Sequence, residues 1–174
     1  MTKQFYIKPD KEYADTFKLI DKIDKSGWVD SSTIIVVCSP EYSSILAQVI
    51  NHKLSHLNKQ VPFDMEFLEM PYPRQELYSV DQYIDDLEAF GKKYVNNNKK
   101  LLFIDSGVLR GKNFSILDNV MEEYIGPSKK KYCCLYKQSD SIFEPDYYTE
   151  EFNKEKQGGL TFWWENNENP YWGW

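Results

Sequence analysis

One segment constrains this chain more than any other: residues 99–117, KKLLFIDSGVLRGKNFSIL. Its four apolar residues, 101–104, have the length and composition of a buried parallel strand. Asp105 then falls at the expected carboxyl end of that strand, where open α/β sheets place their ligands. The next residues, 106–113, contain two glycines and the cations Arg110 and Lys112, and they lead into a helix expected over 114–124. Backbone N–H groups and two cations are therefore expected near the start of this helix. The segment favours an anion site for a phosphorylated sugar or nucleotide, and a plain strand-to-helix connection is the alternative.

Strand and helix patterns alternate along the rest of the chain. Apolar residues at three-to-four spacing predict helices over 10–26, 42–58 and 80–94. Apolar and β-branched runs predict strands over 33–38, 64–70, 132–137 and 160–164. The stretches 71–79 and 138–159 are expected to be irregular. This alternation predicts an α/β fold, a mostly parallel, doubly wound sheet with helices on both faces.

Length and charge narrow the class of protein. A chain of 174 residues buries about 70% of its unfolded surface, and no repeat or linker divides it, so we expect a single domain over 1–174. The formal net charge of −6 argues against duplex nucleic acid as a partner. Since no apolar run approaches the roughly 18 residues of a membrane span, no membrane is expected as a partner either. The three cysteines, without an apolar leader, indicate core thiols in a cytoplasmic protein.

Aromatic residues gather at the end of the sequence. Six of them lie in the last part of the chain: Phe162, Trp163, Trp164, Tyr171, Trp172 and Trp174. Exposed aromatic patches favour association, so this segment is expected to be packed or to be used for binding. A homo-oligomer that uses it as an interface remains open.

Three strings, in their order and spacing, resemble the type I phosphoribosyltransferases, and within them the purine salvage enzymes for hypoxanthine, guanine and xanthine. The first, SGWVDSSTIIVVCSPEYSSILA, is similar to the family's first strand and pyrophosphate loop. The second, LLFIDSGVLRGKN, is similar to its signature for phosphoribosyl pyrophosphate. The third is YCCLYKQSDSIFEPDYYTEE followed by LTFWWE, similar to a late strand and an aromatic segment near the base. The likeness spans nearly the whole chain.

The resemblance implies a chemistry and a set of site residues. Family members transfer ribosyl phosphate to a base nitrogen as pyrophosphate leaves, with Mg²⁺ as cofactor. Asp105 matches the first acid of the signature, so catalysis and the metal would fall on it. The phosphoribosyl group would contact the turn that follows, made of Ser106, Gly107, Arg110, Gly111, Lys112 and Asn113. The purine would stack on Trp163 or Trp164, with the segment 160–174 packed on or beside the base pocket.

The chain departs from the family's pattern at both acids that follow Asp105. Ser106 replaces the second acid, and a hydroxyl brings no charge to a metal. Leu109 stands where the purine enzymes carry an acid that handles a proton. Arg110 and Lys112 replace two hydroxyl donors and remain competent phosphate binders.

The expected pyrophosphate loop also departs from the pattern. It consists here of Ser39, Pro40, Glu41 and Tyr42. Pro40 lacks an N–H donor and Glu41 adds a charge that repels a diphosphate. Two functions therefore stay open: a divergent purine phosphoribosyltransferase, or a non-catalytic relative that binds a nucleotide or another protein.

Structural roles are the alternatives for several of these residues. Asp105 is also a candidate helix-capping or turn acid, and a tryptophan pair near a C-terminus is often core or interface. His52 and His56 lie four apart without a third ligand in the sequence, which is typical of surface histidines. Cys38 lacks a nearby histidine partner and is expected in the core.

Overall fold

The computed structural model describes residues 4–70 and 79–163, and five parallel strands form its central sheet. The strands lie in the order β3-β2-β4-β5-β6, and each neighbouring pair is parallel. Their bounds are β2 (Thr33–Cys38), β3 (Asp64–Leu68), β4 (Lys100–Val108), β5 (Lys130–Gln138) and β6 (Tyr147–Phe152). The continuous apolar runs of β2 and β4 are buried because helices cover both faces of the sheet.

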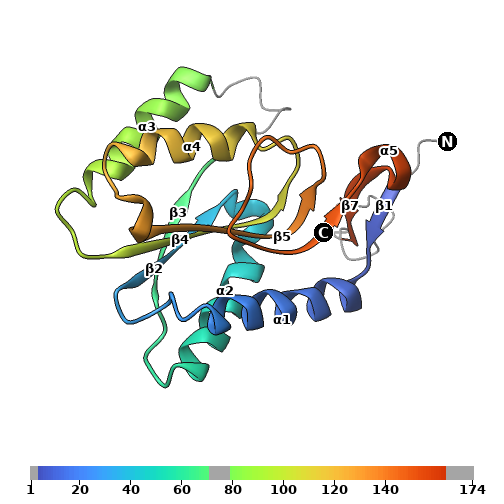
Figure 1. Ribbon diagram of the computed structural model, residues 1–174, viewed down its shortest axis with the longest axis horizontal. Helices are drawn as coiled ribbons and strands as arrows, with labels where there is room; N and C mark the ends of the chain where they lie inside the picture. Colours follow the sequence, from blue (N-terminus) through green and yellow to red (C-terminus); the bar gives the residue numbers. More distant parts are fainter. Residues whose placement is uncertain (1–3, 71–78, 164–174) are drawn as a thin grey trace, which may run out of the picture.

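Two pairs of helices cover the two faces of the sheet (Figure 1). On one face lie α1 (Pro9–Lys25) and α2 (Pro40–Leu57), which share a buried cluster with residues such as Ile35 and Leu102. On the other lie α3 (Val80–Lys92) and α4 (Lys112–Glu122), packed around Phe103. This arrangement confirms the predicted doubly wound α/β fold. A short 3₁₀ helix, η1 (Pro127–Lys129), precedes β5.

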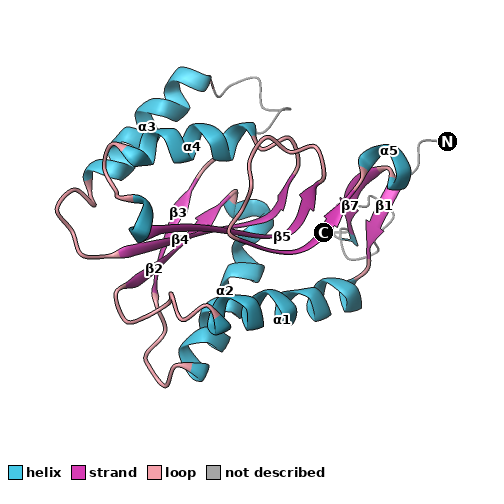
Figure 2. Ribbon diagram, viewed as in Figure 1, coloured by secondary structure: helices cyan, strands magenta, loops and turns pink. Residues whose placement is uncertain are grey.

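A second, two-stranded sheet stands beside the main one (Figure 2). It pairs β1 (Gln4–Ile7) with β7 (Gly159–Phe162) in parallel, and the short helix α5 (Lys154–Gln157) leads into β7. The ring of Tyr136 on β5 contacts Phe5 and Phe162, at centroid distances of 6.2 and 5.7 Å. Tyr136 therefore joins this small unit to the main sheet.

Two sequence predictions need correction, and one strand was missed. The stretch 138–159 is not irregular throughout, because it contains β6 and α5. β6 is an edge strand with mostly half-buried residues, so it lacks the apolar pattern of a strand. β1 was not predicted, since its four residues pair only with β7, more than 150 positions away. β4 continues to Val108, so Asp105 does not lie at the end of its own strand.

Helix starts also differ from the predicted ones. α2 begins at Pro40 rather than 42, because proline fits the first helical position, where its missing N–H is not needed. α4 begins at Lys112 rather than 114, after Gly111. No helix among the described residues is long and apolar enough to cross a membrane.

Candidate functional site

Asp105 lies at the point where the order of the strands reverses. The chain passes from β2 outward to β3 and then returns to β4 on the other side of β2. Ligands of doubly wound sheets bind in the crevice at such a point, outside the carboxyl ends of the strands. Val37 of β2 pairs with Ile104 of β4, so Asp105 is level with Cys38, the last residue of β2. The sequence therefore places Asp105 at the correct edge, although β4 extends beyond it.

The carboxylate of Asp105 is held by its neighbours in the fold. Ser43, in the first turns of α2, donates its hydroxyl to Asp105 Oδ1 at 2.9 Å. The Ser106 N–H lies 2.6 Å from the same oxygen and 3.1 Å from Ser43 Oγ. Asp105 is 9% exposed. Burial raises its pKa to about 6, against the lowering effect of the hydrogen bonds from Ser43, Ser106 and the Gly107 amide.

The turn from β2 into α2 begins at this switch point. Ser39 is buried and adopts the left-handed conformation, with φ of 53°, and its side chain does not cap the helix. Its N–H donates to the Leu68 carbonyl at 3.2 Å. Pro40, Glu41 and Tyr42 form the first turn of α2, and the side chain of Tyr42 lies outside the described part of the molecule. The stretch expected to be a pyrophosphate loop is therefore largely a helix start.

The turn from β4 into α4 follows Asp105 on the same strand. Arg110 and Lys112 are exposed, and no side chain caps α4. Gly111 has a φ of 75°, and a Cβ there would lie 2.5 Å from Ser141 Oγ. The Ile142 N–H donates to the Arg110 carbonyl at 3.1 Å, so the loop after β5 holds this turn in place. The turn thus presents two cations at the start of a helix, as the sequence predicts.

The remaining predicted residues of this turn lie close to it. Ser106 is buried, Gly107 is half-buried, and Asn113 is half-buried in the first turn of α4. A Cβ on Gly107 would lie 3.1 Å from Leu160 of β7, so the small sheet approaches β4 closely here. Leu109 is 45% exposed.

Lys137 is a buried cation that the sequence reasoning missed. It pairs with Val108 across β4 and β5, so it lies near the same edge of the sheet. Its ammonium contacts Glu144 at 2.5 Å and Glu151 at 3.2 Å. The hydrogen bond to Glu144 raises its pKa, and burial opposes this shift. A lysine directly after the apolar run 132–136 is the sequence signal that would have found it.

Trp163 lies against α1. Its indole N–H donates to Glu12 Oε2 at 2.7 Å, and the ring is half-buried. The predicted partner residue in the base pocket, Trp164, lies outside the described residues, as does the rest of 164–174. The role of Trp163 as a base-stacking ring remains a prediction.

The donor set at the site does not fit a magnesium ion held by protein side chains. Within residues 4–70 and 79–163, no three His, Cys, Asp or Glu side chains lie together as a metal site. Asp105 offers a single carboxylate that already accepts hydrogen bonds from Ser43 and Ser106. His52 and His56 are both exposed on α2. Cys38 is fully buried, as predicted, and burial raises the pKa of its thiol well above the usual range.

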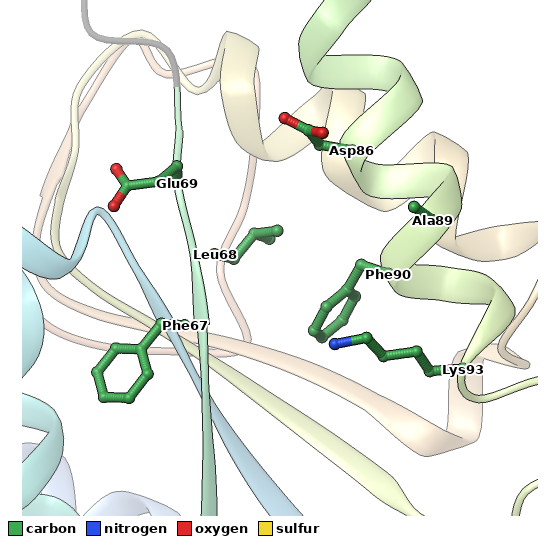
Figure 3. Close-up of a pocket in the computed structure, with 7 residues that line it drawn as sticks. All are labelled: Phe67, Leu68, Glu69, Asp86, Ala89, Phe90 and Lys93. Carbon is green, nitrogen blue, oxygen red and sulfur yellow. The ribbon is translucent and has the colours of Figure 1, made fainter.

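A separate hollow of about 280 Å³ lies between the edge strand β3 and α3 (Figure 3). Leu68 and Phe90 point into it, while Phe67 points away on the other face of the strand. Lys93 borders it and pairs with Glu66 at 3.1 Å. This hollow lies beside β3, which is separated from β4 by β2, and its lining includes neither Asp105 nor the basic turn.

Comparison with known proteins gives matches among solved structures only: no family model and no curated protein sequence matches the chain. A purine phosphoribosyltransferase from Pyrococcus horikoshii superposes with a TM-score of 0.64 at 15% identity, over 94% of this chain and 95% of that one. An HGPRT-ase from Leishmania tarentolae, in complex with GMP, gives 0.60 at 17% identity, over 83% and 79%. A hypothetical protein from Neisseria gonorrhoeae with bound ppGpp gives 0.63 at 12%, over 97% and 92%.

These similarities extend over most of each chain, at sequence identities that reveal the fold alone. They agree with the strand order and the two helical layers described above. The fold of this chain is therefore that of the purine phosphoribosyltransferases.

Proposed function

We propose that this chain binds a purine nucleotide or a related ribose phosphate in the crevice between β2 and β4. The observation that carries the proposal is the basic turn at the start of α4. Gly111 and the loop at 141–143 hold its backbone, and Arg110 and Lys112 are exposed on it. Two solved structures with this fold contain GMP and ppGpp, which supports a nucleotide as the class of ligand.

The turn would hold the phosphate. Guanidinium and ammonium groups bind phosphate oxygens, and uncapped N–H groups at a helix start add donors. No acidic residue lies in the first turn of α4. The sugar would extend from the turn toward Asp105 and the start of α2.

Binding without transfer fits the residues better than catalysis does. Asp105 is engaged by Ser43 and Ser106, and Ser106 and Leu109 cannot act as acids or bases. Transfer of phosphoribose to a purine is the alternative function, and it would need Asp105 to leave these hydrogen bonds.

Isothermal titration calorimetry of the full chain with GMP, IMP and AMP tests the binding. We expect at least one to bind, and Arg110→Ala to weaken it at least tenfold. Lys99→Ala is the matched control, because Lys99 precedes β4 at the opposite end of the sheet. Failure of every nucleotide to bind would overturn the proposal and favour a protein interface.

A turnover assay distinguishes the two functions. Phosphoribosyl pyrophosphate, Mg²⁺ and hypoxanthine, guanine or xanthine are incubated with a high concentration of the protein. We expect no nucleoside monophosphate to form. Formation of one, lost in Asp105→Asn, would instead assign a transferase.

A further inference from the structure

We propose that two copies of this chain associate about a twofold axis through the outer face of α2. The buried residues of the helix, such as Leu46, Ile50 and Leu54, face the sheet. On the opposite side runs a row of exposed residues, the α2 stripe, made of Glu41, Ile45, Gln48, His52 and His56. They are spaced three or four positions apart, so they share one face of the helix.

The α2 stripe is poor in charge compared with the exposed faces of other helices. Glu41 is its only Asp, Glu, Lys or Arg residue, and Ile45 is 76% exposed. Lys53 also belongs to α2, but its ammonium lies 5.5 Å from the ring centroid of Phe17 on α1. Most exposed positions of α1 and α3 are charged, among them Lys18 and Asp85. Depletion of charged residues is typical of a surface that is buried between proteins.

Exposed apolar side chains continue from α2 into the edge strand β3. Leu57 ends the helix and Val61 lies in the next loop, and they are 53% and 81% exposed. Phe67 on β3 points away from α3 (Figure 3) and is 56% exposed. Met65, on the same face of this strand, packs against the cluster that α1 and α2 share. A stable interface buries about 800 Å² on each partner, so these side chains would add to the α2 stripe.

The order of residues along the α2 stripe makes it complementary to a second copy of itself. In a twofold contact, each surface meets the same surface of the other chain. With the axis between Gln48 and Val49, antiparallel helices place Glu41 opposite the partner's His56 and Ile45 opposite the partner's His52. An imidazole N–H can donate to a carboxylate, so both ends of the contact carry a matched polar pair. Parallel helices would instead place Glu41 opposite its own counterpart.

Sedimentation equilibrium of the full chain tests the association. We expect a reversible dimer, and Ile45→Glu should raise its dissociation constant at least tenfold, because the twofold axis places the new carboxylate in the interface twice. Val80→Glu is the matched control. Val80 is 54% exposed on α3, which covers the other face of the sheet, so the dimer should be unchanged. A natural chain that is monomeric at about 100 µM overturns the proposal, as does a dimer that Ile45→Glu leaves intact.

A charge exchange tests the antiparallel arrangement. Glu41→Lys and His56→Glu should each weaken the dimer at least threefold, because each places like charges or two cations opposite one another. The double variant faces opposite charges again, so its dissociation constant should return to within threefold of that of the natural chain. Circular dichroism checks that each variant is folded. Losses that simply add in the double variant overturn the proposed pairing. Nucleotide binding, measured separately by calorimetry, stands or fails independently of these outcomes.

Discussion

Ser43 donates a hydrogen bond of 2.9 Å to Asp105, and this contact ties the start of α2 to β4 at the switch point of the sheet. The two residues lie 62 positions apart, so only the fold brings them together. Both are buried, and Ser43 also accepts a hydrogen bond from the Ser106 N–H. The pair therefore links α2 to β4 at the switch point where we propose that the ligand binds.

Replacing Ser43 by alanine should destabilise the protein by about 1–3 kcal/mol, because a buried carboxylate loses a donor. Urea denaturation near pH 7 measures the change. Ser44→Ala is the matched control, since the Ser44 hydroxyl bonds only to the Pro40 carbonyl of its own helix among the described contacts. That variant should differ from the natural chain by less than about 0.5 kcal/mol. Equal losses in both variants would show that the bond to Asp105 contributes nothing.

The titration of Asp105 should lower the free energy of unfolding of the protein as pH rises from 4 to 6. Its pKa in the folded state is about 6, against 3.8 as the ordinary value, so the folded state binds more protons than the unfolded state in this range. Its contribution to the free energy of unfolding therefore declines by about 2 kcal/mol between pH 4 and pH 6. Asp105→Asn lacks this titration. The stability of the variant relative to the natural chain should rise over this range, and a constant difference would contradict the raised pKa.

Much of the fold follows from local pattern. The strand at 33–38 appears within the predicted bounds because its residues are buried on both faces and leave a continuous apolar run. β1 and β6 escape prediction because their stability comes from partners distant in sequence. Gln4 pairs with Gly159, and Tyr147 pairs with Cys133 at an exposed sheet edge. Such edge pairing leaves little periodic signal in four to six residues.

Part of the candidate site also follows from a local sequence pattern. Asp105 and the basic turn are adjacent in sequence, so one segment reveals them together. Ser43 and Lys137 do not share that segment. They lie in the first and third strings that carry the resemblance, but the resemblance assigns neither of them a role. Their proximity depends on the register of β2, β4 and β5, which the sequence pattern leaves undetermined.

Tyr136→Phe should test the hydrogen bond that joins β5 to α1. The Tyr136 hydroxyl donates to Asp15 Oδ2 at 2.8 Å, while its ring contacts Phe5 and Phe162. The variant keeps the ring and removes only the hydrogen bond to a buried carboxylate, so we expect a loss of about 1.5–3 kcal/mol in urea denaturation. Tyr13→Phe is the control, because Tyr13 is 63% exposed and should change stability by less than about 0.5 kcal/mol. A loss shared by both variants would be inconsistent with a specific role for Asp15.

Gly111→Ala should lower both the stability of the protein and its affinity for a nucleotide. Its φ of 75° costs an alanine about 1–2 kcal/mol, and the new Cβ would lie 2.5 Å from Ser141 Oγ and 2.7 Å from the Phe143 backbone nitrogen. We expect the free energy of unfolding to fall by more than about 2 kcal/mol and, under conditions where the variant is folded, nucleotide affinity to fall because Arg110 moves with the turn.

The control for this change is Gly126→Ala. Gly126 has a φ of −61°, and a Cβ there meets nothing within 4 Å. That variant should keep its nucleotide affinity and be unchanged or more stable by up to about 1 kcal/mol. If Gly111→Ala unfolds at the same urea concentration as the Gly126 variant, the contact between the basic turn and the loop at 141–143 is not what fixes the turn. If it loses stability and yet binds nucleotide normally, the phosphate does not lie on this turn.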